Sequence, residues 1–520
     1  MRRILNQCPR ISAGELPGIL LVMLGAVALG FYYSWWFMED RLSSPWLGLG
    51  LAVAIGYTGV QLLGNWLIYL AAPYRSGPPY PSSNENPTVD VFITAYQEEP
   101  ALIERALAAV CAMPGNHRIW LLDDGQDPAL AHLARRLGVG YLTRTNREHA
   151  KAGNINAALA QTDGDIIVIF DIDHAPKPNF LERTLPYFED AEIGFVQVML
   201  TFENGTGSWV AQAAAESSLD FYNPVAIGTD GLNSATLIGS NALIRRKALA
   251  SIGGYQPGLA EDLATSIALH AAGWRSVYVP EPLAPGYAPP DLAAWFTQQM
   301  KWARGVFELL LTAYPRYFPR LNLGQRIAYA VRMTYYWIGP VTCIHLLATL
   351  GLLFSANHDA LASFQQYLIH LLPLGSMAVI IRQFALHKWH HPSLKPTLQG
   401  KPLMLVYATW PIYTLAWLMT ILRLPLTFRP TPKRSSGRLN PVWLLPQAVT
   451  LLSLVGGVFY TFTVVEGYFY VLLFCFAAGQ SIPQADLLRQ FLYPNLISKK
   501  REIFSHQVIS HKVIYKKRRF

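Results

Sequence analysis

Several apolar stretches of this chain are long enough to cross a membrane, and they flank one segment of soluble composition. Two of them, residues 17–37 and 46–72, precede that segment, and the others lie near residues 327–353, 366–381, 441–464 and 468–480. About 20 apolar residues in a helix span a hydrocarbon core. The pattern therefore predicts six crossings. With 520 residues, 52% hydrophobic and 14% charged, the composition fits a membrane protein with one globular domain.

The net charge of +9 is explained more simply by lipid than by nucleic acid. Lys and Arg concentrate in residues 1–10, 423–438 and 499–519, next to apolar stretches. Anionic lipid and the positive-inside rule account for that placement. We therefore expect contact with membrane lipid and no nucleic-acid partner. If the basic N-terminus stays in the cytoplasm, the soluble segment after the second crossing is cytoplasmic too.

One further apolar stretch, residues 403–422, is predicted not to cross. It is long enough, but basic residues lie on both sides of it, at 387–401 and 423–438. Because a crossing helix with positive charge at both ends conflicts with the positive-inside rule, we expect an interfacial or re-entrant helix there. Both chain ends are then expected in the cytoplasm.

The segment from about residue 89 to residue 290 alternates short β-branched runs with Ala-rich stretches. Strand-like runs and helix-like runs follow one another at 89–94, 100–111, 118–122, 128–137, 152–160, 166–170 and 194–198. This alternation predicts an α/β fold with a mainly parallel sheet covered by helices. In such folds ligands bind beyond the carboxyl ends of the strands.

Acidic residues stand at two of these predicted strand ends. Asp123 and Asp124 precede Gly125, and Asp171 and Asp173 follow the run 166–170. A nucleotide diphosphate leaving group needs a divalent cation, and Mg²⁺ and Mn²⁺ prefer carboxylate oxygens. We predict that Asp171 and Asp173 bind the metal, with His174 as an additional ligand. Ordinary polar turns after the strands are the alternative interpretation for both pairs.

Three other positions carry candidate chemistry. Lys151 precedes a helix, where a cation and backbone N–H groups face a phosphate; the alternative is an ordinary surface lysine. Glu261 and Asp262 begin another helix, and a carboxylate there can accept a proton from an attacking sugar hydroxyl; the alternative is helix capping. Trp302 offers an apolar face to a pyranose ring beside Lys301, although membrane anchoring also explains a tryptophan there.

Taken in this order, the clusters resemble those of the processive glycosyltransferases of family 2, and most closely the bacterial cellulose synthases. The resemblance covers about residues 17–480 and implies a GT-A-like glycosyltransferase domain inserted in an α-helical transmembrane region. Asp123 and Asp124 match the DDG motif of that family, and Asp171 and Asp173 match its metal-binding DxD. Asp262 matches the catalytic aspartate of its TED motif.

The resemblance also implies residues that bind the substrates. Tyr96 and Glu98 are the implied uridine contacts, and Gln298, Lys301 and Trp302 match QxxRW, in which the tryptophan stacks on the acceptor sugar. A segment similar to the FxVTxK gating loop, which closes over the nucleotide, supplies Phe428, Thr431 and Lys433.

Three residues depart from the family pattern. Ala260 replaces the threonine of TED, Pro430 replaces the valine of the gating loop, and Lys301 replaces the arginine of QxxRW. Lysine keeps the charge but loses the two-pronged contact of arginine. The sequence ends at Phe520, which leaves no room for a PilZ domain, so regulation by cyclic di-GMP is not expected.

The expected organisation has five parts. They are an N-terminal region with two transmembrane helices (1–72), a cytoplasmic transferase domain (73–290), an interfacial helix with the QxxKW motif (291–325), a C-terminal transmembrane region with the second interfacial helix and the gating loop (326–487), and a basic cytoplasmic tail (488–520).

The resemblance implies an inner-membrane enzyme. It would use Mg²⁺ or Mn²⁺ to polymerise a cellulose-like β-1,4-glucan from UDP-glucose, and it would translocate the polymer, with a periplasmic export subunit as a possible partner. A synthase of mannan, mixed-linkage glucan or β-1,3-glucan is the first alternative. The second is a catalytically silent polysaccharide-binding scaffold, which Ala260 and Lys301 favour.

Overall fold

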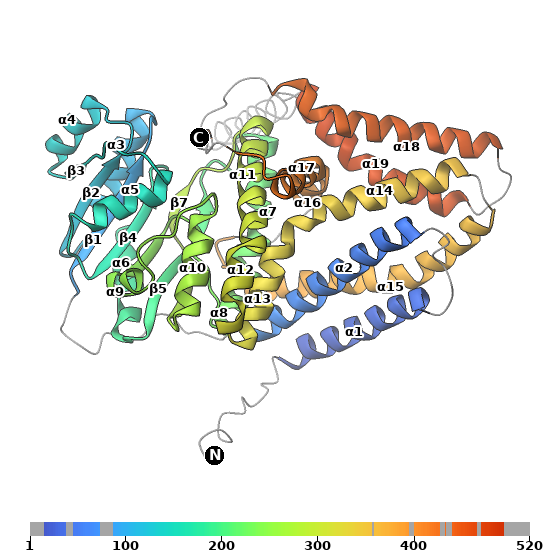
Figure 1. The fold of residues 1–520 in the computed structure, drawn as a ribbon, viewed down its shortest axis with the longest axis horizontal. Helices are drawn as coiled ribbons and strands as arrows, with labels where there is room; N and C mark the ends of the chain where they lie inside the picture. The colour runs from blue at the N-terminus through green and yellow to red at the C-terminus, as the bar shows by residue number, and fades with distance from the viewer. Residues whose placement is uncertain are drawn as a thin grey trace, which may run out of the picture.

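An α/β domain packs against one end of a group of long apolar helices (Figure 1). The structure is a computed structural model, and it describes residues 15–37, 45–72, 87–355, 358–394, 400–426, 432, 439–464 and 470–492. The predicted fold class, an α/β domain inserted between apolar helices, is confirmed.

The domain is built on a seven-stranded mixed sheet in the order β3-β2-β1-β4-β6-β5-β7. The first four strands in sequence run parallel, whereas β6 is antiparallel to both its neighbours and β7 runs parallel to β5. The strands are β1 (Val89–Ala95), β2 (His117–Asp123), β3 (Gly140–Leu142), β4 (Ile166–Asp171), β5 (Ile193–Phe202), β6 (Ala242–Arg245) and β7 (Arg275–Gly286).

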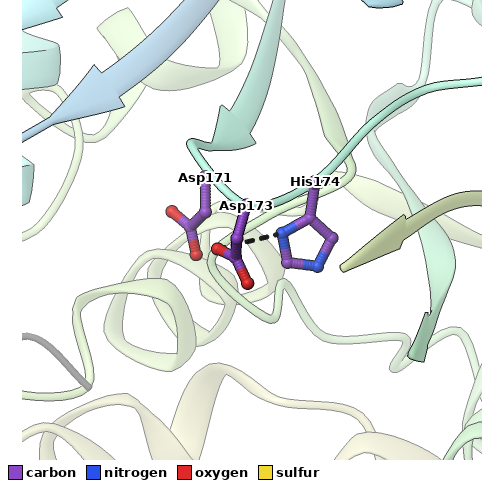
Figure 2. A group of neighbouring side chains, drawn as sticks. All are labelled: Asp171, Asp173 and His174. Atoms are coloured by element: carbon purple, nitrogen blue, oxygen red, sulfur yellow. Dashed lines mark ion pairs between the residues drawn. The ribbon is translucent and has the colours of Figure 1, made fainter. Parts of the chain in front are cut away.

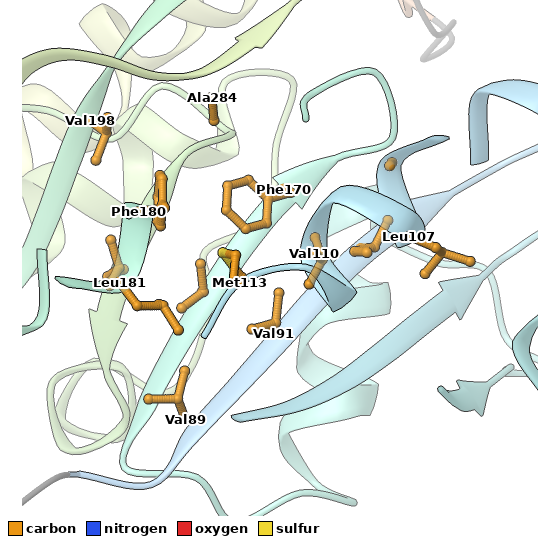
Figure 3. Packing of buried hydrophobic residues seen from close by; sticks show 14 of the residues in the cluster. Val89, Val91, Leu107, Val110, Met113, Phe170, Phe180, Leu181, Val198 and Ala284 are labelled. Carbon is orange, nitrogen blue, oxygen red and sulfur yellow. The ribbon is translucent and has the colours of Figure 1, made fainter. Parts of the chain in front are cut away.

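Side chains of alternate strand residues enter two cores, one on each face of the sheet. Val91 and Phe170 pack with α3 and α6 on one face (Figure 3), whereas Phe92 and Ile169 pack with α5 and α9 on the other. A strand buried on both faces reads as a continuous apolar run, as residues 166–170 do. The covering helices are α3 (Pro100–Cys111), α4 (Pro128–Leu137), α5 (Ala150–Leu159), α6 (Phe180–Thr184), α9 (Arg246–Ser251) and α10 (Glu261–Ala271), with the 3₁₀ turn η1 (Leu185–Glu189) after α6.

The parallel register places three strand ends at one edge. Ala95 of β1 pairs with Asp123 of β2, and Thr94 pairs with Asp171 of β4. The residues that follow these strands therefore meet at the carboxyl edge, where ligands bind in open α/β sheets.

A layer of shorter helices lies between the sheet and the long helices (Figure 1). Ala260, Phe307 and Tyr413 belong to one buried core that joins the α/β domain to this layer and to the membrane region. Side-chain caps fix the N-termini of α11 and α13. The Asp291 carboxylate accepts a hydrogen bond from Ala294 N–H at the start of α11, and Asn322 forms a capping box with Gln325 at the start of α13. The layer comprises α7 (Trp209–Asp220), the π-helix η2 (Phe221–Val225), α8 (Ala226–Gly231), α11 (Leu292–Leu311), α12 (Ala313–Tyr317) and η3 (Phe318–Arg320).

Six helical segments of the described chain are long and apolar enough to cross a membrane: Leu16–Trp36, Ala52–Ala71, Leu323–Phe354, Gln366–Trp389, Gly400–Ile421 and Pro441–Thr463. Five of them coincide with predicted crossings. The elements that form this region are α1 (Leu16–Phe37), α2 (Pro45–Ala71), α13 (Leu323–Thr334), η4 (Tyr335–Trp337), α14 (Ile338–Ser355), α15 (His358–Trp389), α16 (Gly400–Ala408), α17 (Trp410–Ile421), η5 (Pro441–Leu444), α18 (Leu445–Val464) and α19 (Tyr470–Leu492).

The segment Gly400–Ile421 is the stretch that we predicted to be interfacial. It breaks into α16 and α17 at Thr409, whose hydroxyl accepts a 2.9 Å hydrogen bond from the indole of Trp295 on α11. Figure 1 shows both helices almost end-on, whereas α14 and α18 lie lengthwise. This crosswise direction supports an interfacial position. The last predicted crossing, residues 468–480, falls in α19, which also runs lengthwise but carries Asp486 and Arg489.

The side of the membrane on which α19 ends tests this arrangement. If α16 and α17 lie along the interface, a reporter fused after Leu492 should report the same side as one inserted in the α/β domain, and a fusion after Phe37 should report the opposite side. A reporter after Leu492 on the opposite side would mean that Gly400–Ile421 crosses the membrane.

Candidate active site

The three predicted metal ligands are brought together at the end of β4. One ligand atom from each of Asp171, Asp173 and His174 lies within 4.8 Å of the others (Figure 2). Asp173 and His174 are buried, and Asp173 Oδ1 lies 3.6 Å from His174 Nδ1. Both ring nitrogens of His174 are buried without a hydrogen-bond partner in the part of the chain that the structure describes. Two carboxylates and an imidazole whose nitrogens make no hydrogen bond to the described residues suit a divalent cation.

The end of β7 holds the His174 ring in this position. A Cβ atom added to Gly286 would lie 2.6 Å from His174 Nε2, so a side chain there would displace the ring. The backbone N–H of the next residue, Tyr287, donates to Asp173 at 3.2 Å. The carboxyl end of β7 thus fixes two of the three predicted ligands, Asp173 and His174, which follow the carboxyl end of β4.

Lys151 is not a surface lysine, because its ammonium group is buried within the site. It forms a close ion pair with Asp171 and donates to the carbonyl oxygen of Gly239 at 2.6 Å. Burial lowers the pKa of Lys151, but the carboxylates of Asp171, Glu261 and Asp262 raise that pKa more, so that it lies above its ordinary value. Lys151 therefore stays charged and links α5 to β4.

Glu261 and Asp262 begin α10 on the other side of Gly239. Burial, together with repulsion from Asp262, raises the pKa of Glu261 to about 7. Burial also raises the pKa of Asp262, although a 2.7 Å hydrogen bond from Leu263 N–H and nearby cations oppose the shift. A Cβ atom added to Gly239 would lie 3.4 Å from Asp262 Oδ2 and 3.7 Å from Lys151 Nζ. The carboxylate and the ammonium group thus both lie against this glycine.

The DDG turn is organised by its own aspartates. Asp123 is fully buried and accepts hydrogen bonds from Gly125 N–H, Asp127 N–H and the Tyr141 hydroxyl at 2.7–2.9 Å. Asp124 forms a two-pronged ion pair with Arg144, at 2.7 Å for each hydrogen bond. These contacts satisfy both carboxylates within the domain.

Arg144, which the sequence analysis missed, also donates at 2.7 Å to the carbonyls of Glu148 and Ala150, where α5 begins. It therefore connects the DDG turn to the helix that carries Lys151.

The predicted uridine contacts lie beside this turn. Tyr96 is partly exposed, and the Glu98 carboxylate accepts from the backbone N–H of Tyr96. Gln97 between them has a positive φ of 59°, a conformation that is uncommon for a residue other than glycine. The sharp turn leaves the Tyr96 ring accessible at the carboxyl edge.

Helix α11 brings the predicted acceptor residues to the same place. Trp302 is 38% exposed, Gln298 is half-buried, and the charge of Lys301 acts on both Glu261 and Asp262. Gln299 is buried and accepts a 2.9 Å hydrogen bond from the Tyr413 hydroxyl of α17. The hydrogen bond from α17 thus holds the buried side of the motif in place, and the indole of Trp302 stays partly exposed.

The close approach of α11 to the start of α10 depends on Gly305. A Cβ atom added there would lie 2.8 Å from Ala260 N and 2.9 Å from Ala260 Cβ. Ala260 is itself part of the core shared with the membrane region. A small residue at position 260 is therefore compatible with tight packing of the two helices.

Two more residues of this region were missed by the sequence analysis. The Ser240 hydroxyl accepts from Asp171 N–H at 2.9 Å, and nothing in the sequence pattern marks it. Arg332 of α13 contributes a charge that opposes the raised pKa of Asp262. The sequence did contain a signal for Arg332, because an arginine inside a predicted membrane span is rare and often functional. The predicted gating-loop residues Phe428, Thr431 and Lys433 lie outside the described residues.

The chain is similar to known proteins in sequence and in fold. The family described as glycosyltransferase like family 2 matches residues 87–305, and the cellulose synthase family matches residues 250–389. A UDP-forming cellulose synthase catalytic subunit of Pseudomonas fluorescens is 32% identical over 378 residues, which cover 69% of this chain and 51% of that protein. The corresponding subunit of Xanthomonas axonopodis pv. citri is 33% identical over 339 residues, covering 62% and 46%.

Cellulose synthase 1 of Komagataeibacter xylinus is 32% identical over 371 residues, which cover 68% of this chain and 24% of that protein. The chain therefore spans about half or less of the length of these curated relatives.

Among solved structures, a mannosyltransferase from Pyrobaculum calidifontis in complex with GDP-Man and Mn²⁺ is similar in fold. Its TM-score is 0.51 at 18% identity, and the match covers 73% of this chain and 99% of that protein.

Replacing Gly305 with alanine tests the packing that positions Asp262. Because the added methyl group meets the backbone of Ala260, we expect Gly305→Ala to lower the free energy of unfolding by about 1–3 kcal/mol. Gly351→Ala on α14 is the matched control, since no atom lies within 4 Å of the added Cβ. Thermal unfolding in detergent measures both. A Gly305→Ala protein as stable as the control would contradict the close approach.

Proposed function

The chain contains a family 2 glycosyltransferase domain related to that of the bacterial cellulose synthases, and on this premise we propose that it is a processive inverting transferase in the membrane. The proposed reaction polymerises a cellulose-like β-1,4-glucan from UDP-glucose and moves the polymer outward through the membrane helices. The observation that carries the proposal is the meeting of Asp171, Lys151 and Asp262 around Gly239, beside the accessible indole of Trp302.

In this proposal Asp262 is the base that activates the acceptor. Its carboxylate accepts the proton of the attacking sugar hydroxyl, while Trp302 supports the acceptor ring. Burial raises the pKa of Asp262 from its ordinary value, and a base works better when its pKa lies closer to the working pH. Attack on the face opposite the departing nucleotide inverts the anomeric carbon and gives a β-linkage.

The donor is held on the other side of Gly239. Asp171, Asp173 and His174 would hold Mg²⁺ or Mn²⁺, which supplies positive charge against the diphosphate. Tyr96 and Glu98 are placed to contact the uridine, next to the DDG turn that Asp123 and Asp124 organise. Lys301 contributes a further cation toward the pyrophosphate, and Lys151 keeps Asp171 in place. Phe428, Thr431 and Lys433 would close over the nucleotide.

We place the protein in the bacterial inner membrane, with the transferase domain in the cytoplasm, where UDP-sugars are made. The basic residues next to the apolar spans support that orientation. A periplasmic subunit that receives the polymer would be a partner in this arrangement.

Synthesis of another β-linked polysaccharide is the nearest alternative, because the residues described above do not distinguish one donor sugar from another. A silent scaffold is less consistent with the site. Ala260, one of the two departures that favour a scaffold, lies at the contact with Gly305, where its small size has a packing reason. The buried carboxylates of the site are all retained.

Separating the base from the metal ligands tests the proposed roles. Asp262→Asn should abolish incorporation of sugar and leave UDP binding intact, because only the proton acceptor is lost. Asp173→Ala should weaken both the metal-dependent binding of UDP and the transfer. Asp163→Asn, whose carboxylate is exposed, is the control. Calorimetry and radiolabel incorporation measure these effects, and loss of UDP binding in Asp262→Asn would contradict the assignment.

Lys301 gives a separate test at the position that departs from the family. If its ammonium group faces the pyrophosphate as a point charge, Lys301→Arg should be tolerated, because arginine supplies two parallel hydrogen bonds. Lys301→Ala should reduce the rate of UDP formation by roughly 10–100-fold, the loss expected for a charge-assisted hydrogen bond. Alanine variants with unchanged kinetics would show that Lys301 does not contact the donor.

A further inference from the structure

One cation near Asp262 has no role in the mechanism above. Arg332 of α13 places its guanidinium carbon 4.2 Å from the centre of the Phe221 ring in η2. Its Nε atom is buried without a hydrogen-bond partner, and the guanidinium group forms no ion pair with a carboxylate of the described residues. Lys151, by contrast, is fully engaged with Asp171 and Gly239.

The charges of Arg332 and Asp262 both affect the pKa of the same aromatic residue, Tyr222. Burial raises the pKa of Tyr222, and the charges of Arg332 and Asp262 act on that pKa in opposite directions. Tyr222 follows Phe221 in η2, a π-helical turn with Pro224 inside it; such turns are frequent at functional sites. Tyr329 and Tyr336, which flank Arg332 in the sequence, pack in one core with Ala260 and Leu263 at the start of α10. The segment that carries Arg332 therefore packs against the part of α10 that carries Asp262.

A partly buried cation at the start of a membrane span is costly unless it has a partner. Asp262 provides an opposite charge but no direct ion pair, so the two side chains are separated by more than a salt-bridge contact. Phe221 covers one face of the guanidinium group. Stacking of this kind leaves the N–H groups at the edge of the plane able to donate.

We propose that Arg332 binds hydroxyl groups of the terminal sugar of the acceptor and so orients the attacking hydroxyl toward Asp262. The ligand is an uncharged pyranose, held between the N–H groups of Arg332 and the aromatic side chains of this region. The proton of the attacking hydroxyl still passes to Asp262, and Arg332 gives up no proton. This inference rests on the proposed transferase function.

The alternative role for Arg332 is purely electrostatic, in which its charge only helps to keep Asp262 ionised. The other titratable and charged groups that face Asp262 come from several elements and would remain in any Arg332 variant: Glu261, Lys151, Lys301, Tyr222, Tyr255 and Tyr336. A lysine at position 332 would retain the charge but lose the planar group with several donors.

The test compares Arg332→Met and Arg332→Lys with Arg326→Met in the full chain, reconstituted in lipid vesicles with labelled UDP-glucose and Mn²⁺. Arg326 is a matched control on the same helix. It is half-buried like Arg332 and also lies over a phenylalanine, Phe318, at 4.8 Å, but its Nε donates to the backbone carbonyl of Phe318. Two rates are measured at several pH values, the rate of UDP release and the rate of sugar incorporation into polymer, together with the Kd for UDP.

Both Arg332 variants should bind UDP like the wild type. Their incorporation of sugar per UDP released should fall roughly tenfold or more, the loss expected for hydrogen bonds from a charged group, because water replaces the poorly held acceptor. Arg326→Met should behave like the wild type.

Unchanged incorporation per UDP in Arg332→Met would overturn the proposal. So would recovery in Arg332→Lys, or recovery of Arg332→Met at higher pH, since both would show that only the charge matters. If Arg332→Met does not fold, the incorporation of sugar per UDP released by Arg332→Lys tests the proposal alone. Absence of UDP release by the wild type would instead contradict the proposed function, on which the inference depends.

Discussion

The ion pair between Lys151 and Asp171 is the interaction on which the rest of the site depends. It joins α5 to the end of β4, and the same ammonium group donates to Gly239, against which Asp262 also lies. The group of buried carboxylates would repel one another without this cation. With it, the carboxyl edge of the sheet can hold the proposed base and the proposed metal ligands close together, as the proposed transfer of a sugar to an acceptor hydroxyl requires.

The site is completed by helices outside the α/β domain. Helix α11 contributes Trp302 and packs directly on Ala260 through Gly305, and its buried face is hydrogen-bonded to α17 and to Thr409, the N-cap residue of α17. His270 at the other end of α10 is held between Ser276 and Tyr329 of α13. Burial lowers the pKa of His270 to about 3, so this link stays uncharged. Helix α10, which carries the proposed base, is thus fixed at its start against α11 and at its end against α13 of the membrane region.

Local sequence signals predicted much of this arrangement, because periodicity and strand-end carboxylates are local properties. The parallel strands, the cluster of Asp171, Asp173 and His174, and most of the apolar spans followed from them. The antiparallel insertion of β6 between β4 and β5 was not predicted, since strand order depends on long-range pairing. The partners of Asp124 and Asp171 were also missed, because Arg144 and Ser240 are 20 and 69 residues away. No periodicity encodes contacts at such separations.

The most direct test of the account is to supply the purified protein in lipid vesicles with labelled UDP-glucose and a divalent cation, and to analyse the linkage of the product. The account predicts metal-dependent formation of UDP together with a long β-1,4-linked glucan that only a matching endoglucanase degrades. Formation of UDP with free glucose as the sole product, or a polymer with α-linkages, would contradict processive inverting transfer.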